Sequence, residues 1–223
     1  MFAASVALQI IVDLEETTVA FVFPTSIPCS SQILLQVRYK GILNNQMAGF
    51  YRSHYKDWRG DDKMVLSTQF EALDARRALP CVDEPSAKAT FIVSLTVPSN
   101  LECFSNMPES SRSTVTENNY GKEVATDLVQ ISFLETPRMS TYLLAFCVGE
   151  FDYIQTQTEH GVLIKVYAPR GRSTSGRFAL DCAKRCLDAY DDFFGVPYPL
   201  PKLDMVAIPE FVSVVHTGHE KPA

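Results

Sequence analysis

Gln69 and Glu71, two residues apart in the segment TQFE, are the residues of this chain whose types and spacing best suit binding chemistry. If that segment is extended, side chains two apart on a strand point the same way. A carboxylate supplies charge and a nearby amide oxygen supplies a directed acceptor, which together suit an ammonium group. The pair therefore predicts a small amine-binding surface.

The same segment also supports a structural interpretation. Arg76 and Arg77 follow Glu71 closely, and either one can form an ion pair with it in a salt-linked bend. Pro80 and Pro85 would stiffen the backbone of such a bend. On the residues alone, the salt-linked bend is the more common arrangement. The amine-binding hypothesis remains open as the alternative.

The composition is that of a globular chain with an acidic balance. Its 223 residues are 46% hydrophobic, which is ample for a core, and the formal net charge is -6. Basic residues are scattered among acidic ones, so we expect no nucleic-acid partner. No apolar run approaches the roughly 20 residues that cross a bilayer, so we expect no membrane association and a cytoplasmic location.

The six cysteines lack the spacing of a disulfide framework, which predicts reduced thiols. Cys182 and Cys186 are four residues apart, on one side of a helix rather than in a C-x-x-C turn. We interpret these two as small buried residues, because free cysteine is one of the most buried residue types.

Alternation with a period of two runs from the start of the chain to about Tyr167, the pattern of strands with one buried face. Many short strands with few helical runs predict a mainly β fold, either a sandwich or a large curved sheet. The predicted strands, of which the first and fourth are the clearest, are 34–40, 19–23, 64–71, 89–97, 127–135, 141–149, 151–157 and 162–168.

The period changes to three and four after residue 176, which predicts an amphipathic helix over 178–194. Ser173 or Ser175 can cap its start, and Gly195 can end it. A buried strand at 203–209 follows, and the change of pattern near Val166 predicts a domain boundary. The apolar residues that recur along the helix are Phe178, Cys182, Cys186, Tyr190, Phe193 and Phe194.

Longer segments carry a family resemblance. They are YKGILNNQMAGFYRSHYKD at 39–57, SNMPE from Ser105, TPRMSTYLLAFCVGEFDY at 136–153 and FGVPYPLPKLDMVAIPEF at 194–211. Together with TQFE they extend over most of the chain from about Val19 to Phe211. In these segments the sequence resembles the zinc aminopeptidases of the gluzincin class, the aminopeptidase N family, and most nearly the puromycin-sensitive type.

The resemblance implies a saddle-like β-sandwich as the amino-terminal domain, at residues 1–165, without the family's first strands. The truncated start of an α/β thermolysin-like catalytic domain would follow at 166–211, with a divergent tail at 212–223. In the family, the Gln and Glu of TQFE help to hold the free amino group of a peptide, and they match Gln69 and Glu71. The implied function is that of the amino-terminal part of a zinc metallo-aminopeptidase, whose partner is the amino terminus of a peptide.

The sequence departs from the family at the catalytic elements. It contains no H-E-x-x-H motif, and its four histidines are His54, His160, His216 and His219. Thr217 stands where the family has the Glu of a Gly-Ala-Met-Glu-Asn element. We therefore expect this chain to have no catalytic residue and to bind no zinc or other cofactor, although zinc serves the parent family.

Two hypotheses follow for the function. The chain is an aminopeptidase fragment that is inactive alone, or it is a non-catalytic binding or interaction module derived from the β domain. The apolar face of the helix at 178–194 also predicts self-association, because exposed apolar faces promote contact between copies.

Overall fold

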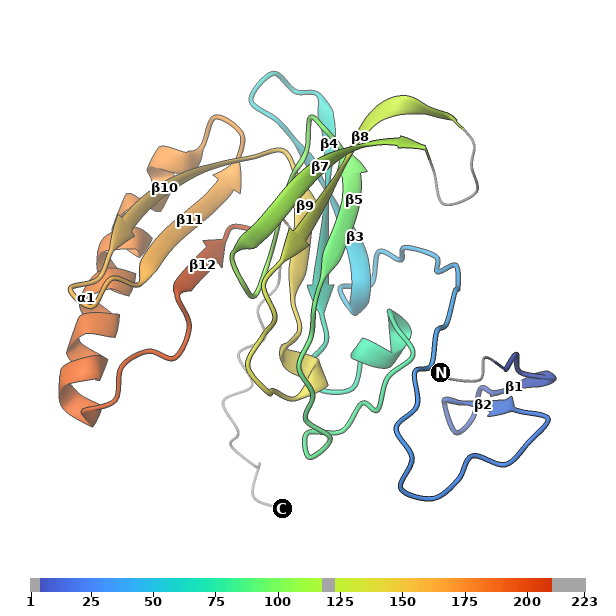
Figure 1. Ribbon diagram of the computed structural model, residues 1–223. Coiled ribbons are helices and arrows are strands. Elements are labelled where there is room, and N and C mark those ends of the chain that lie inside the picture. The colour runs from blue at the N-terminus through green and yellow to red at the C-terminus, as the bar shows by residue number, and fades with distance from the viewer. Residues whose placement is uncertain (1–4, 118–122, 210–223) are drawn as a thin grey trace, which may run out of the picture.

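The structure is a computed structural model that describes residues 5–117 and 123–209 (Figure 1). Its described part is mainly β, with one α-helix and strands arranged in four sheets. The predicted mainly β fold class is therefore confirmed. No helix of the described residues combines the length and the apolar character that crossing a membrane requires.

Two antiparallel sheets form the sandwich at the centre of Figure 1. The four-stranded sheet has the order β3 (Gly49–Lys56), β4 (Asp62–Gln69), β9 (Phe146–Gly149) and β6 (Glu102–Ser105). The three-stranded sheet has the order β5 (Ser94–Pro98), β8 (Glu123–Phe133) and β7 (Glu109–Glu117). Ile131 and Phe133 of β8 pack with Val148 of β9, so one apolar cluster fills the space between the sheets.

The third sheet consists of β10 (Phe151–Gln157), β11 (Leu163–Pro169) and β12 (Lys202–Val206). Strands β11 and β12 are parallel, and helix α1 (Arg177–Phe194) is the crossover between them. Residues on both sides of position 166 share this sheet, and the predicted boundary there stays a prediction. A second apolar cluster joins the third sheet to the four-stranded one, and within it the rings of Phe104 and Tyr167 stack with centroids 4.1 Å apart.

Helix α1 matches its predicted range, and Gly195 ends it in the left-handed conformation with φ 63°. The predicted serine cap is wrong, because the N-cap is Gly176 and it makes no side-chain capping bond. Ser173 and Ser175 lie instead in the short 3-10 turn η3 (Ser173–Gly176). A Cβ at Gly176 would lie 2.7 Å from Val166 Cγ1, so this close approach of turn and strand requires glycine.

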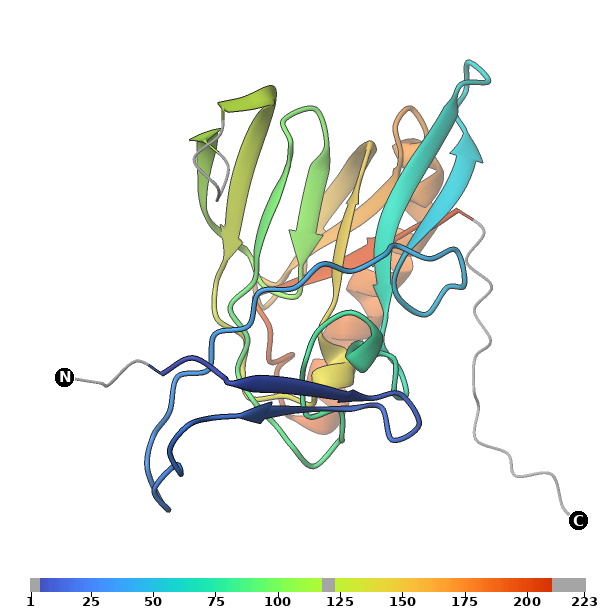
Figure 2. The ribbon, with the colours of Figure 1, turned by 90° about the vertical axis from the view of Figure 1, so that its right-hand side faces the viewer.

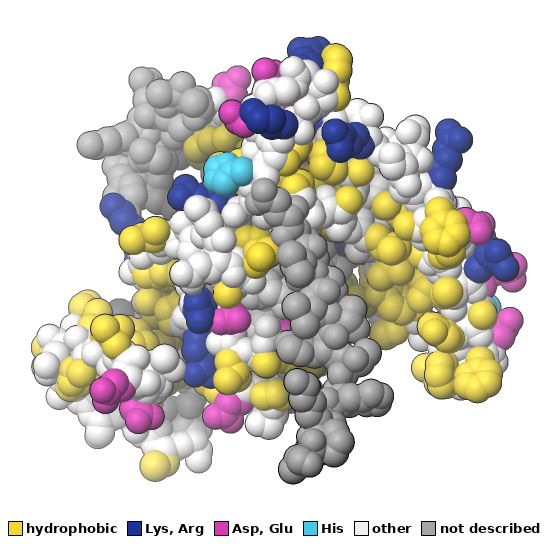
Figure 3. Space-filling view, turned by 180° about the vertical axis from the view of Figure 1, so that it is seen from behind, with side chains coloured by type: hydrophobic (Ala, Val, Ile, Leu, Met, Phe, Trp, Pro, Cys, Tyr) yellow, Lys and Arg dark blue, Asp and Glu magenta, His cyan; other side chains and the backbone are white. Residues whose placement is uncertain are grey.

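The aromatic residues of α1 are exposed, whereas Leu180 and Leu187 of the same helix are partly buried. Phe178 and Phe193 are each 81% exposed, and Phe194 is 65% exposed. Figure 3 shows apolar side chains gathered over the helix at the right-hand edge of the molecule. All six cysteines are free, but Cys186 is exposed and Cys182 only partly buried, so the prediction that both are buried is wrong.

The amino-terminal segment forms a two-stranded hairpin of β1 (Gln9–Asp13) and β2 (Thr18–Val22), which lies across the lower part of Figure 2. The predicted strand at 34–40 is wrong, since this segment has no regular structure. Its alternation is real, but a strand needs a neighbour to pair with, and no described strand pairs here. The Tyr39 hydroxyl donates instead to the Ala78 carbonyl at 2.8 Å.

Two other predicted strands are shorter than expected. The strand predicted at 89–97 begins only at Ser94. Before it, Phe91 bonds to Thr136 through the Thr136 hydroxyl and backbone, and Ala89 forms an isolated bridge with Met139 instead of a continuous ladder. The strand predicted at 141–149 begins only at Phe146. The 3-10 turn η2 (Thr141–Leu143) occupies its first residues.

Candidate functional site

Gln69 is the last residue of β4, and Glu71 lies past it in the turn that leads to the 3-10 turn η1 (Ala75–Arg77). The strand thus ends two residues before the predicted end at 71. Phe70 is 2% exposed and fixes the end of the strand in the core. Gln69 is partly buried, Glu71 is exposed, and Gln69 Nε2 donates to the Glu71 carbonyl oxygen at 3.4 Å.

The ion pairs of the neighbouring bend do not involve Glu71. Arg76 Nε lies 3.1 Å from Asp83 Oδ2, and the Asp83 side chain is only 3% exposed. Arg77 Nε lies 2.6 Å from Asp74 Oδ1. Within residues 5–117 and 123–209 no ion pair of Glu71 is found, so the prediction that Glu71 braces either arginine is wrong. The bend is salt-linked, but by Asp74 and Asp83.

A glycine allows this bend to pack beside Gln69. Gly49 of β3 is the cross-strand partner of Gln69, and its φ of 72° lies in the left-handed region. A Cβ at Gly49 would lie 2.8 Å from Arg77 Cβ. Only a residue without a side chain meets both conditions, so Gly49 sets how closely η1 approaches the end of β4.

Gln69 also lines a cavity of about 330 Å³ between the four-stranded sheet and β12. Its floor is a row of side chains on one face of the sheet, because Tyr51 pairs with Ser67, Ser67 with Cys147, and Cys147 with Phe104. Gln69 lies two residues beyond Ser67 on β4, and therefore on the same face. Burial raises the pKa of the Tyr51 hydroxyl, against the smaller opposing effect of the Ser67 hydroxyl.

A buried ion pair stands on the opposite side of the cavity. Lys202 and Asp204 are two apart on β12 and pair with each other, with side chains 10% and 9% exposed. Lys202 Nζ also donates to the Ser105 carbonyl of β6 at 2.7 Å, which ties β12 to the four-stranded sheet. Asp204 Oδ1 is buried and has no hydrogen-bond partner among the described residues, whereas the buried Tyr51 and Ser67 hydroxyls lie close enough to interact with each other.

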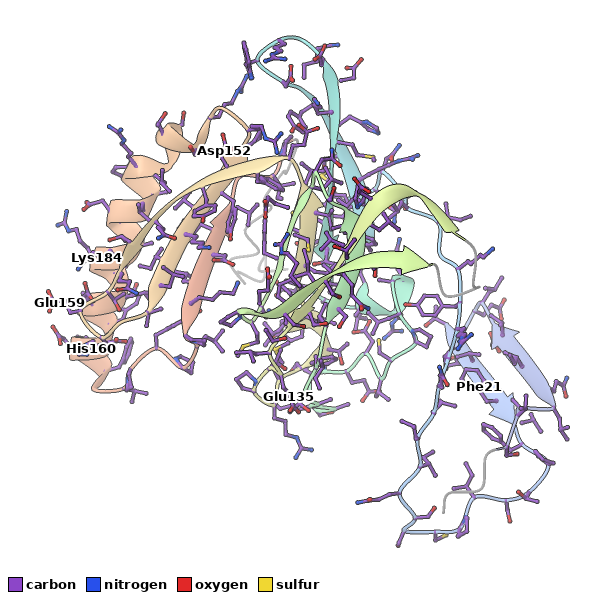
Figure 4. All side chains as sticks on the ribbon, turned by 45° about the horizontal axis from the view of Figure 1, so that its top comes forward. Phe21, Glu135, Asp152, Glu159, His160 and Lys184 are labelled. Carbon is purple, nitrogen blue, oxygen red and sulfur yellow. The ribbon has the colours of Figure 1, made fainter. Side chains whose placement is uncertain are left out.

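The described histidines stand apart from this cavity. His54 lies in β3, and His160 lies at the turn between β10 and β11, beside α1 (Figure 4). His216 and His219 lie outside the described residues. Over residues 5–117 and 123–209, no group of three or more His, Cys, Asp or Glu side chains is arranged to hold a metal ion. The described residues therefore do not fit a zinc ligand set.

Sequence reasoning missed the residues around the cavity, Tyr51, Ser67, Lys202 and Asp204. A signal for two of them was present, since a Lys-x-Asp pair in a strand predicted to be buried places two opposite charges on one face. For Tyr51 and Ser67 no such signal exists. Their meeting depends on the register of β3 and β4, which the sequence pattern alone leaves open.

The comparisons with known proteins agree with one another. The family model described as "Peptidase M1 N-terminal domain" matches residues 2–143. Aminopeptidase M1-D of Oryza sativa subsp. japonica is 44% identical over 199 residues, which are 89% of this chain and 21% of that protein. The puromycin-sensitive aminopeptidase of Caenorhabditis elegans is 44% identical over 180 residues, 81% of this chain and 18% of that protein.

A yeast relative shows a similar degree of identity and coverage. The alanine/arginine aminopeptidase of Saccharomyces cerevisiae is 45% identical over 178 residues, 79% of this chain and 20% of that protein. The chain thus spans about a fifth of the length of the curated relatives that it matches.

Proposed function

The chain belongs to the peptidase M1 family, and from this premise we propose that it is the amino-terminal part of a metallo-aminopeptidase that removes amino-terminal residues from peptides. The observation that carries the proposal is the family match over residues 2–143, which includes the TQFE segment at the end of β4. Identity of 44% over 180 residues to a puromycin-sensitive aminopeptidase supports the same substrate class.

In this proposal Gln69 and Glu71 hold the amino group of the peptide. The Glu71 carboxylate is exposed and has no ion-pair partner among the described residues, so its charge is available to an ammonium group. The Gln69 side chain is held near Glu71 by its contact with the Glu71 carbonyl, which brings its amide oxygen close to the same ammonium. A charge-assisted contact of this kind contributes about 1.5 to 3 kcal/mol.

The chemistry itself would require residues that the described part of this chain does not supply. When bound, zinc would activate the attacking water, and neither described histidine belongs to a ligand group. The 223-residue chain alone would then bind part of the substrate and hydrolyse nothing.

A chimera tests the proposal. Residues 19–209 replace the matching segment of the Caenorhabditis elegans enzyme, and hydrolysis of aminoacyl arylamides is measured beside the 223-residue chain alone. We expect turnover by the chimera only. In the chimera, we compare kcat/KM for substrates with a free amino group with kcat/KM for amino-blocked substrates. Glu71→Ala should lower the ratio of the first to the second by about tenfold to a hundredfold.

The matched control is Glu84→Ala, because Glu84 is an exposed acid of the same segment. It should leave both kcat/KM and the melting temperature unchanged. An unchanged ratio in Glu71→Ala, or an equal loss in Glu84→Ala, would reject the anchor role. Turnover by the chain alone, with one tightly held zinc, would reject the fragment interpretation.

A second candidate function is a non-catalytic interaction module. The observation that favours it is the uncovered aromatic face of α1, where Phe178, Tyr190 and Phe193 are more than half exposed. Such an exposed aromatic surface suits contact with another polypeptide, including a second copy of this chain. Concentration-dependent association, without any turnover by the chimera, would favour this function over the first.

A further inference from the structure

Helix α1 presents two thiols that take no part in the proposed peptide binding. Cys182 and Cys186 are both free, Cys186 is exposed and Cys182 is partly buried. Residues four apart lie on one face of a helix, with their Cβ atoms about 5 to 6 Å from each other. The helix therefore carries a dithiol at its surface.

The spacing of this dithiol does not suit a disulfide between the two cysteines. A disulfide holds its Cβ atoms about 3.5 to 4.5 Å apart, which is closer than two regular helix positions four apart. A direct S–S bond would thus require the helix to deform. A single atom inserted between the two sulfurs spans the wider gap and leaves the helix intact.

The number of ligands limits which atom can bridge the thiols. Zinc in a structural site takes four protein ligands, and the dithiol supplies only two. Over residues 5–117 and 123–209 no group of three or more His, Cys, Asp or Glu side chains is arranged to add the others. A trivalent arsenic atom that carries one organic group forms three bonds, so two thiolates complete it.

We propose that Cys182 and Cys186 form a binding site for an organic trivalent arsenical. Cys186, the more exposed thiol, attacks the arsenic first, and Cys182 then closes the ring. With an aryl arsenoxide, two As–S bonds replace the As=O bond, the two thiol protons leave with the oxygen as water, and arsenic stays trivalent. Phe178 and Tyr190, each one helical turn from the nearer thiol, are 81% and 57% exposed and provide apolar surface for the organic group.

The other four cysteines form no comparable surface dithiol. Cys103 and Cys147 are buried, and they occupy neighbouring register positions of β6 and β9, so their side chains point to opposite faces of the sheet. Burial raises the pKa of the Cys81 and Cys103 thiols to about 11, which keeps both protonated at neutral pH. Cys29 is exposed but lies outside the helix, and it serves as the matched control.

Phenylarsine oxide added to the reduced 223-residue chain tests the site. The measurement needs no turnover, so its result does not depend on the peptidase assignment. Intact-mass spectrometry should show one phenylarsenic group per chain, and thiol titration should show two fewer free thiols than the six of the untreated chain. The adduct should survive excess glutathione, a monothiol, and be removed by dimercaptopropanol, a dithiol that competes for both As–S bonds.

Three variants and a control locate the adduct. Cys182→Ser and Cys186→Ser each leave a single As–S bond, so retention against glutathione should fall about a hundredfold or more. The double variant Cys186→Ser, Ala189→Cys keeps two thiols on the helix, at an exposed position, but separates them by about 10.5 Å along the axis, and it should lose the adduct equally. Cys29→Ser should retain it as the unmodified chain does.

Each result supports or overturns the proposal. A glutathione-resistant adduct that needs both Cys182 and Cys186 at their native spacing establishes the site. Resistance that persists in Cys182→Ser, or that is lost in Cys29→Ser, would place the arsenic on other thiols. Equal resistance in the variant with Ala189→Cys would show that the spacing of the helix positions is not what holds it. The absence of any resistant adduct would mean that the two thiols act separately.

Discussion

The β sandwich and helix α1 place the same residue type in opposite environments. Phe133 of β8 is 4% exposed between the two sheets, whereas Phe193 of α1 is 81% exposed. Both lie in amphipathic elements, so the pattern of apolar residues is equally good in each. The difference is the presence of a second layer. An amphipathic pattern identifies which face of an element needs cover, but another element must supply that cover.

The comparison of the sandwich with α1 predicts that the same substitution, Phe to Ala, has very different effects on stability at the two sites. Phe133→Ala should lower the free energy of unfolding by about 3 to 5 kcal/mol, because it opens a cavity in the core. Phe193→Ala should change it by less than about 0.5 kcal/mol, since its ring touches mostly solvent. Urea unfolding followed by far-UV circular dichroism measures both. Similar losses in the two variants would mean that the face of α1 is covered in solution.

The bend after β4 offers the same comparison for charged residues. Arg76→Ala removes the guanidinium that pairs with the 3% exposed Asp83 carboxylate and leaves it only the backbone N–H of residue 76, which should cost about 3 kcal/mol of unfolding free energy. Arg77→Ala removes a more exposed pair, in which the Arg77 side chain is 53% exposed, and should cost about 1 kcal/mol or less. The same urea experiment ranks the two. Equal costs would show that Asp83 is more accessible to water than its position indicates.

These contrasts also show which elements of the fold could be predicted from the sequence. Strands β2, β4, β8, β10 and β11 follow from periodicity, because each pairs with a neighbouring strand, and helix α1 follows from its local period alone, because its backbone hydrogen bonds lie within the helix. Alternation at 34–40 is as regular, yet no described strand pairs with it, and the segment is irregular. Periodicity reports which face is apolar, whereas a strand also needs a hydrogen-bonding partner that is distant in the sequence.

The candidate site could likewise be predicted from the sequence only in part. Residue type and spacing pointed to Gln69 and Glu71 as candidates, and the family resemblance supplied their role, which stays a prediction. The end of β4 at Gln69 and the ion pairs of Arg76 and Arg77 differ from expectation. The cavity could not be foreseen. It forms where β12 meets a row of residues from other strands, and no local pattern encodes that meeting.

The last prediction concerns the uncovered face of α1 and has the smallest expected effect. Because Phe178 and Phe193 are each 81% exposed on one helix, two copies of the chain gain apolar burial when these faces meet. The double variant Phe178→Ser, Phe193→Ser should weaken self-association in sedimentation equilibrium about tenfold, which is about 1.4 kcal/mol. Trp58→Ser is the control, since Trp58 is 64% exposed but lies in the loop between β3 and β4 rather than on the helix. A chain that stays monomeric at all concentrations, or equal weakening by the control, would remove α1 as the contact surface and leave its aromatic residues merely solvated.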